Sequence, residues 1–457
     1  MSSIALLRGV MAIATLALAC GACDGSSSSH HATSPAAYPL KASRDGRLLV
    51  DQRDMPFLVQ GEAAWGLIAA ATIEDAELYL KNRKQKGFNA VLVRLLEHKF
   101  VDRPPLNVYG HGPFTTPGDF STPNDAYFAH VDRVIRKANE KNILVLLAPA
   151  YLGFEGGNEG WFTEMKANGV VKLRNYGRYL GNRYKAFPNI LWVEAGDFNP
   201  PTPELVRAVA QGILDNDPDH LHTAHCGRGN SAIDCFPGED WLTVNASYTS
   251  FITYEKVLED YNRFPFKPFF LLDAQYENEN GSTPASLRAQ AYWAILSGAQ
   301  GQSFGNNPVW VFDGVPLYPP PYLWEEGLED QGSHDMSRVT ALFASRTWYR
   351  LVPDPTHEVV TSGFGSFGSN NYVTAAGTPE GRLVMAYIPS TGTGRRSLTV
   401  DMSKLSGPAQ GLWYNPTSGE YTPISGSPFA NTDSRTFTTP GNNGTGTNDW
   451  ALVLEVP

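Results

Sequence analysis

Carboxylates stand at the ends of two apolar runs in this chain, a placement that suits acid–base chemistry. Residues 190–201 read ILWVEAGDFNPP, so the first run gives way to Glu194 and Asp197 and then to prolines that cannot continue a strand. Residues 268–280 read PFFLLDAQYENEN, so a second run leads to Asp273 and Glu277. Glycoside hydrolysis uses such a pair, because one acid protonates the leaving oxygen and the other acts as nucleophile or base.

The alternation of side chains along a strand selects among these acids. Asp197 shares a face with small apolar residues that suit a barrel interior, whereas Glu194 falls on the other face, towards the helices. In the second run Asp273, Gln275 and Glu277 share one face, and Glu277 is the last of the three. We therefore predict Asp197 and Glu277 as the catalytic pair, with Asp273 as the alternative nucleophile.

Strand-like and helix-like segments alternate from about Asp45 onwards, which is typical of an α/β protein. Eight such units over roughly 300 residues predict a (β/α)8 TIM barrel. A doubly wound open sheet is the runner-up, but no G-x-G-x-x-G turn follows the first strand. Thr72 is the predicted N-cap of the first helix. The expected strands lie in residues 56–61, 89–98, 143–151, 190–197, 221–229, 241–250, 267–280 and 301–312, and the main helices in 72–87, 124–142, 171–187, 202–217, 253–264, 283–299 and 335–351.

The sequence changes character after about His357. Short alternating runs separated by Gly, Ser, Thr and Asn predict a small all-β antiparallel sandwich. We therefore expect three regions: a signal peptide with a Ser-rich linker at 1–40, a barrel catalytic domain at 41–355, and a C-terminal β-sandwich domain at 356–457.

Active residues of such barrels lie at the C-terminal ends of the strands. At those ends this chain carries carboxylates, carboxamides and aromatic rings, which suit a polyhydroxylated ligand because polar groups bond hydroxyls and rings stack on sugar faces. The predicted substrate-binding residues are Glu62, Trp65, Glu97, His98, Tyr151, Asn199, His225, Asn245, Tyr248, Gln275, Tyr276, Asn306 and Trp310.

Other chemistries find little support. The net charge is −10 and no basic block occurs, which argues against a nucleic-acid partner. No H-E-x-x-H motif is present, and the three-residue spacing of His222 and His225 puts them on opposite faces of a strand, so we expect no metal and no cofactor. A G-x-S-x-G elbow is also missing, which disfavours a serine hydrolase of that class.

The N-terminus resembles an export signal, with an early Arg, an apolar stretch from about Gly9 to Ala19, and then small residues. Cys20 or Cys23 resembles a lipoprotein cleavage cysteine, which would anchor the protein to a membrane, and plain secretion is the alternative. We expect a periplasmic, cell-surface or secreted bacterial protein. Two further cysteines, Cys226 and Cys235, predict a disulfide in an exported chain. The sequence does not indicate the oligomeric state.

The segments GEAAWGL, KGFNAVLVRLL, ILWVEAGDFNP, LLDAQYENE and AYWAILSGAQGQSFGNNPVW together resemble the apiosidase-like glycoside hydrolases, over most of residues 45–352. The segment GLWYNPTSGEY resembles the small β-sandwich, named for collagen binding, that accompanies this barrel. The resemblance implies a retaining mechanism, with Asp197 as acid/base and a strand-seven glutamate as nucleophile. Where the family has Glu-Pro-x-Tyr-Glu, this chain keeps Tyr276 and Glu277 but has Asp273 at the earlier acidic position. Glu62 replaces the aspartate of the family's GDTAW segment.

Two functions remain open at this stage. The first is an exported retaining glycosidase that cleaves plant or microbial polysaccharides, which intact Asp197 and Glu277 favour. The second is a catalytically inactive barrel that binds glycans at the cell surface, which the departures at Asp273 and Glu62 favour.

Overall fold

The structure is a computed structural model that describes residues 35–250 and 252–457. The expected signal peptide, most of the expected linker, and Cys20 and Cys23 lie outside the described residues. Within the described ranges, no helix has both the length and the apolar character that a membrane span requires.

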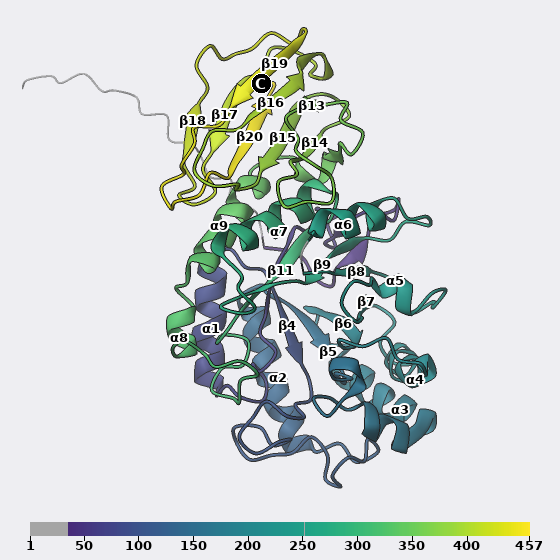
Figure 1. Cartoon of the computed structure of the whole chain (residues 1–457). Coiled ribbons are helices and arrows are strands. Elements are labelled where there is room, and N and C mark those ends of the chain that lie inside the picture. The colour runs from purple at the N-terminus through teal and green to yellow at the C-terminus, as the bar shows by residue number, and fades with distance from the viewer. Residues whose placement is uncertain (1–34, 251) are drawn as a thin grey trace, which may run out of the picture. The chain divides into compact units, whose positions relative to one another are not determined.

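A parallel β-barrel forms the first domain and confirms the predicted fold class (Figure 1). Its strands follow the order β7-β6-β5-β4-β3-β11-β9-β8, and Thr243 and Val244 donate backbone hydrogen bonds to His222 O where β8 meets β7. The short strand β10 (Tyr276–Glu277) pairs with β11 outside this path. The barrel strands are β3 (Val59–Ala63), β4 (Ala90–Arg94), β5 (Leu144–Ala148), β6 (Ile190–Ala195), β7 (His222–His225), β8 (Asn245–Tyr248), β9 (Phe269–Asp273) and β11 (Gly301–Asn306).

Helices connect these strands and surround them, as Figure 1 shows. Thr72 is the N-cap of α1, where it and Asp75 form a capping box, so that prediction is confirmed. The third helix begins at Phe162 rather than near 171, because it continues across a kink at Gly169, whose φ is 69°. The helices are α1 (Ile73–Gln85), α2 (Asp125–Glu140), α3 (Phe162–Tyr184), α4 (Pro203–Leu214), α5 (Ala232–Cys235), α6 (Thr253–Tyr261), α7 (Pro284–Leu296), α8 (Trp324–Gly327) and α9 (Gln331–Ala344).

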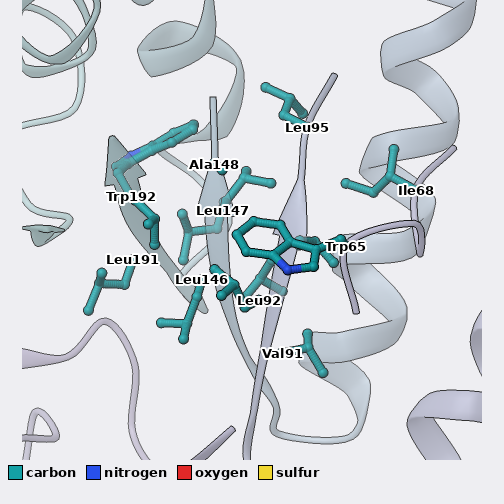
Figure 2. Close-up of a cluster of buried hydrophobic side chains, with 14 of the residues drawn as sticks. Trp65, Ile68, Val91, Leu92, Leu95, Leu146, Leu147, Ala148, Leu191 and Trp192 are labelled. Atoms are coloured by element: carbon teal, nitrogen blue, oxygen red, sulfur yellow. The ribbon is translucent and has the colours of Figure 1, made fainter. Parts of the chain in front are cut away.

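The barrel core is continuous because its strands are buried on both faces. Every residue of β4, β5 and β6 is buried, as expected for parallel strands covered by helices. Figure 2 shows Leu92, Leu146 and Leu191 from these strands in one cluster with Trp65, which follows β3. The core therefore extends to the residues that begin the β3–α1 connection.

Residues from 352 onwards form antiparallel sheets, which confirms the predicted sandwich. One sheet has the order β12-β14-β15-β20-β17-β18 and the other β13-β16-β19, with Trp413, Phe437 and Leu452 in their shared core. The strands are β12 (Val352–Pro353), β13 (Val360–Ser362), β14 (Thr374–Gly377), β15 (Leu383–Ile388), β16 (Ser397–Asp401), β17 (Gln410–Tyr414), β18 (Tyr421–Pro423), β19 (Ser434–Thr438) and β20 (Trp450–Glu455).

Buried contacts join the sandwich to helix α7. Arg288 donates from Nε to Asp449 at 2.7 Å and from Nη1 to Asp335 of α9 at 2.8 Å, and all three side chains are buried. The rings of Tyr292 and Tyr387 stack with centroids 4.4 Å apart. Because the buried Arg288 has one carboxylate partner in the sandwich and another in the barrel domain, loss of any of the three should weaken the contact between the domains.

Candidate active site

A strained turn at the end of β6 presents Asp197. Ala195, Gly196 and Asp197 have consecutive positive φ angles of 64°, 146° and 52°. A Cβ at Gly196 would lie 2.3 Å from the Tyr151 ring, so only glycine fits there. Simple alternation along the strand therefore stops at Ala195, and the turn rather than the strand places the Asp197 side chain. Asp197 Oδ1 is buried and accepts no hydrogen bond from the described residues.

His225 at the end of β7 lies between two of the predicted acids. Its Nδ1 accepts a hydrogen bond from the Asp197 backbone N–H at 3.2 Å. Its Nε2 lies 3.2 Å from Asp273 Oδ2, without the alignment of a hydrogen bond. The Nδ1 acceptor role implies the tautomer with a proton on Nε2, which faces the Asp273 carboxylate. Strands β6, β7 and β9 thus bring Asp197, His225 and Asp273 together.

Aromatic rings surround these three residues. The Trp65 ring stacks on His225 with centroids 5.5 Å apart, and Tyr151 lies 5.8 Å from Trp65. Tyr248 lies 5.1 Å from His225, and Trp65 Nε1 donates to the Tyr276 hydroxyl at 2.8 Å. Flat rings beside carboxylates are the combination that a sugar ring requires, since its faces are apolar and its edge carries hydroxyls.

Burial shifts the titration of this cluster. Burial raises the pKa of Asp197, the Asp273 charge raises it further, and His225 opposes the shift. Burial also raises the pKa of Tyr248, as do the charges of Asp273 and Asp197. A carboxyl with a raised pKa keeps its proton to higher pH, which is what a general acid needs.

Two arginines add positive charge at the edge of the cluster. The Arg94 guanidinium lies 4.3 Å from the centroid of the Tyr151 ring and pairs with Glu97 at 3.3 Å. Arg228, on the exposed loop after β7, places two nitrogens 3.4 Å from the Tyr248 hydroxyl. Burial opposes the shift, but Tyr248 and then the Asp197 and Asp273 charges raise the pKa of Arg228 above its ordinary value. Both cations therefore stabilise ionised carboxylates nearby.

The structure does not bring Glu277 to Asp197. After Asp273 the chain leaves β9 and pairs with β11 as β10, so the face shared by 273, 275 and 277 is broken. Glu277 Oε1 accepts from Gly332 N at 2.9 Å, at the start of α9, and Oε2 accepts from Asn306 Nδ2 at 3.0 Å. Burial raises the Glu277 pKa to about 7, and Asp330 adds to the shift. Its carboxylate is bound to α9 rather than to the cluster around His225.

A further acid, Glu279, lies near the cluster, although no role was predicted for it. Its Oε1 accepts a hydrogen bond from Trp310 Nε1 at 2.8 Å. Burial raises the Glu279 pKa to about 7, and the charge of Asp273 adds to the shift. The only sequence signal was its position two residues after Glu277, which does not distinguish it from a surface acid.

Two predicted substrate contacts, Glu62 and Glu97, are bound within the protein. Glu62 is fully buried and pairs with Arg83 of α1 at 2.7 Å, while the Tyr79 hydroxyl donates to it at 2.6 Å. Glu97 is also buried, and its Oε1 accepts three successive backbone N–H groups at 2.9 Å each. Both carboxylates therefore bind other parts of the protein. A position at the end of a strand does not by itself decide where a long side chain points.

Most of the other polar residues predicted to bind substrate form hydrogen bonds that hold loops in place. His98 contacts Glu164 and the Asn158 carbonyl, each at 3.1 Å. The side-chain oxygen of Asn199 accepts from Gly227 N at 2.8 Å, and that of Asn245 accepts from Ile233 N at 3.2 Å. The half-buried Gln275 has its backbone bonded to Gln290, and the buried Asn306 donates to Glu277 and Asp330.

The predicted disulfide between Cys226 and Cys235 is confirmed. It closes the loop that directly follows His225 and carries Arg228, so it fixes the backbone on one side of the candidate site. The predicted separation of the two histidines also holds: His222 Nδ1 contacts the buried Glu194 at 3.1 Å, away from His225. Glu194 therefore has the structural position that the alternation predicted.

An eight-stranded parallel barrel with carboxylates and aromatic rings at its strand ends has the architecture of the TIM-barrel enzymes. The family model described as "Apiosidase-like, catalytic domain" matches residues 43–350, so the chain belongs to this family. Residues 355–455 match the model described as "Putative collagen-binding domain of a collagenase". No curated protein matches the chain.

Solved structures share the architecture. One described as a glycoside hydrolase is 24% identical with a TM-score of 0.78, and the match covers 92% of this chain and 97% of the other. A glycoside hydrolase family 5 protein from Bacteroides vulgatus is 24% identical with a TM-score of 0.77, over 91% and 93% of the two chains. A family 5 mannosidase from Rhizomucor miehei is 14% identical with a TM-score of 0.50, over 67% and 97%. At these identities the likeness is one of fold.

Proposed function

We propose that this protein is a retaining glycoside hydrolase that cleaves glycosidic bonds in plant or microbial polysaccharides. The observation that carries the proposal is the arrangement around His225, which contacts the Asp197 backbone on one side and the Asp273 carboxylate on the other. Membership of the apiosidase-like family and the folds of the glycoside hydrolases it resembles support the same reaction class.

Asp197 is the proposed acid/base. Its pKa is raised by burial and by Asp273, and its Oδ1 has no hydrogen-bond partner among the described residues, so a substrate oxygen can receive its proton. In the first step Asp197 protonates the leaving glycosidic oxygen. In the second it takes a proton from the attacking water, which restores the acid.

Asp273 is the proposed nucleophile. Its carboxylate lies beside His225 Nε2 and raises the pKa of Asp197, Tyr248 and Glu279, so its charge acts on the whole cluster. Attack on the anomeric carbon breaks the bond to the leaving oxygen and forms a glycosyl ester, which water then hydrolyses. Glu277, the first choice from the sequence, has one carboxylate oxygen bound by Gly332 of α9 and the other by Asn306 of β11, and it stays as the competing assignment.

We also propose that the protein acts outside the cytoplasm, anchored by a lipid on Cys20 or Cys23 or freely secreted. The apolar N-terminal stretch followed by small residues supports export. Polysaccharide substrates of this kind are too large to reach an internal enzyme, which agrees with the proposed reaction.

The test is digestion of a glycan library by the wild type, Asp197→Ala and Asp273→Ala, with products identified by mass spectrometry. The proposal expects the wild type alone to cleave one glycan class. NMR should show that the first product has the same anomeric configuration as the substrate, as retention requires. Hydrolysis that persists in both variants contradicts the assignment. A wild type that binds glycans without cleaving any of them identifies the inactive glycan-binding barrel instead.

A further inference from the structure

A cavity of about 910 Å³ lies at the end of the barrel opposite the candidate active site. Phe269, the first residue of β9, lines it, whereas Asp273 ends the same strand, about 13 Å further along at the usual rise per residue. Its other walls come from the β1 (Lys41–Ala42) to β2 (Leu49–Val50) hairpin, the α6–β9 connection, the turn before β11 and residues 348–352. The residues of the candidate active site do not line it.

Three cations in this cavity form no ion pair with the described residues: Arg44, Arg47 and Lys267. Lys267 is half-buried, and burial lowers its pKa, while the charge of Asp240, beyond ion-pair distance, opposes the shift. A fourth cation, Arg350, is paired with Glu380 at 3.0 Å. Such unpaired cations stand out in a chain whose net charge is −10.

The acids of the same cavity have partners of their own. Asp54 pairs with Lys41 at 2.8 Å, and Asp260 pairs with Arg263 at 2.7 Å. Asp45 accepts from the hydroxyl of its neighbour Ser43 and from the backbone N–H of residue 47. These bonds lower the Asp45 pKa, and the Arg47 charge adds a smaller contribution without forming an ion pair. The unpaired charge in the cavity is therefore positive, which favours an anionic ligand.

One cation of this cavity, Arg47, is held in place before any ligand arrives. The Arg47 guanidinium lies 3.3 Å from the centroid of the Phe266 ring, and its Nη1 donates to Tyr261 O at 3.3 Å. The buried side chain of Gln300 accepts from Leu49 N at 2.6 Å and donates to the carbonyl of residue 47. A fixed guanidinium loses little freedom when it binds a carboxylate.

Aromatic side chains complete the lining. Tyr349 is 40% exposed and Phe266 is 38% exposed, and Trp348 packs edge-on against Tyr349 with centroids 5.9 Å apart. Exposed rings offer apolar faces to sugar rings, whereas a site for a small inorganic anion would not need them. The ligand that fits both features carries carboxylates and ring faces together.

We propose that this cavity is a second carbohydrate site that binds oligosaccharides containing uronic acids. The ligand class rests on the proposed function, whereas the site itself is separate from the reacting residues. Arg44, Arg47 and Lys267 bind the sugar carboxylates, and the exposed ring of Tyr349, against which Trp348 packs, contacts the ring faces. The site would hold an acidic polysaccharide on the enzyme while the barrel mouth acts on another part of it.

The test measures binding of tetragalacturonic acid to the full chain by isothermal titration calorimetry, with cellotetraose as the neutral match and inorganic phosphate as the small anion. The key variant is Arg44→Gln/Arg47→Gln/Lys267→Gln. Its matched control is Lys81→Gln/Lys166→Gln/Arg395→Gln, which removes the same charge from exposed positions outside the cavity. A third protein, Asp197→Ala/Asp273→Ala, removes the candidate catalytic carboxylates.

The proposal expects tetragalacturonic acid to bind at least tenfold more weakly to the cavity variant than to its control, and to weaken with added salt. It expects this binding to survive in the Asp197→Ala/Asp273→Ala protein, so that failure of the proposed catalysis does not remove it. Equal binding by the cavity variant and its control overturns the proposal, as does no binding to the wild type. Equally tight binding of cellotetraose, or of phosphate, overturns the assigned ligand class.

Discussion

His225 Nε2 lies 3.2 Å from Asp273 Oδ2, and this contact joins strand β7 to strand β9 at the end of the barrel where the strands terminate. Because Nδ1 of the same ring accepts from the Asp197 backbone N–H, one imidazole contacts both residues. The contact therefore favours Asp273 over Glu277 as the partner of Asp197.

Asp273→Asn and Glu277→Gln should separate the two assignments of the nucleophile. Loss of a nucleophilic carboxylate should lower kcat by at least about 10³-fold, so we expect that effect in Asp273→Asn. Glu277→Gln should stay within about tenfold of the wild type, since its carboxylate faces α9. The measurement is kcat on the glycan identified by the library screen. The reverse order of the two effects would assign the nucleophile to Glu277.

Asp197→Asn should lower kcat by about 10²- to 10⁴-fold, the usual contribution of a general acid. In the wild type, kcat/KM should fall with rising pH as the acid loses its proton. Because burial raises the pKa of Asp197, this fall should occur above the ordinary range of an aspartic acid. The variant should show no such limb in its pH–rate profile. Asp219→Asn, at an exposed position, is the control and should retain the wild-type profile.

The stability of the protein should decrease as the pH rises from about 4.5 to about 7. Burial raises the pKa of Glu277 from 4.5 to about 7, so between these values the folded state holds more protons than the unfolded state. The stabilisation is complete below the unfolded pKa and is lost as the pH passes the folded pKa. Urea unfolding between pH 4.5 and 8 measures it. Glu277→Gln should show a shallower decrease, and Glu279 should account for part of what remains.

The exposed substitution Glu325→Gln controls for the change in net charge and should keep the wild-type slope. Parallel slopes for Glu277→Gln and the wild type would contradict the role of burial at Glu277.

Arg288→Met should destabilise the protein by about 3–5 kcal/mol, because it leaves the buried Asp449 carboxylate without its cation and removes one of the two cations of Asp335. Chemical denaturation measures the free energy of unfolding. Arg338→Met is the matched control: Arg338 also pairs with Asp335, at 2.7 Å, but is partly exposed, so its loss should cost less. Equal effects would show that the joint between α7 and the sandwich does not depend on Arg288.

Replacing both Cys226 and Cys235 by Ala should lower the free energy of unfolding by roughly 2–3 kcal/mol, as expected for a loop of this length. Activity should also fall, because the loop carries Arg228 and is bonded to Asn199. A reductant should shift the thermal midpoint of the wild type towards that of the double variant. A wild type that is insensitive to the reductant, with the double variant equally stable, would contradict this role.

The sequence predicted the barrel because its signals are local. Eight apolar runs, each followed by a helical segment, were sufficient to expect β3 to β9 and β11, and Thr72 was recognised from capping chemistry alone. The candidate site was harder to predict from the sequence, because it depends on departures from regular strand geometry. Alternation predicted the position of Glu194, which contacts His222, but it ends at Ala195 and does not place Asp197. It also joined Asp273 to Glu277, which the pairing of β10 with β11 breaks.

By itself, then, the sequence determined the α/β barrel, the sandwich, the disulfide and the two strands that carry the acids. Only the tertiary structure decided which acid accompanies Asp197, because that depends on the directions in which side chains leave irregular backbone. Glu62 and Glu97 illustrate the same limit, since both stand at strand ends and both are bound inside the protein. The position of a residue along the chain follows from local patterns, whereas its partners follow from packing between segments distant in sequence.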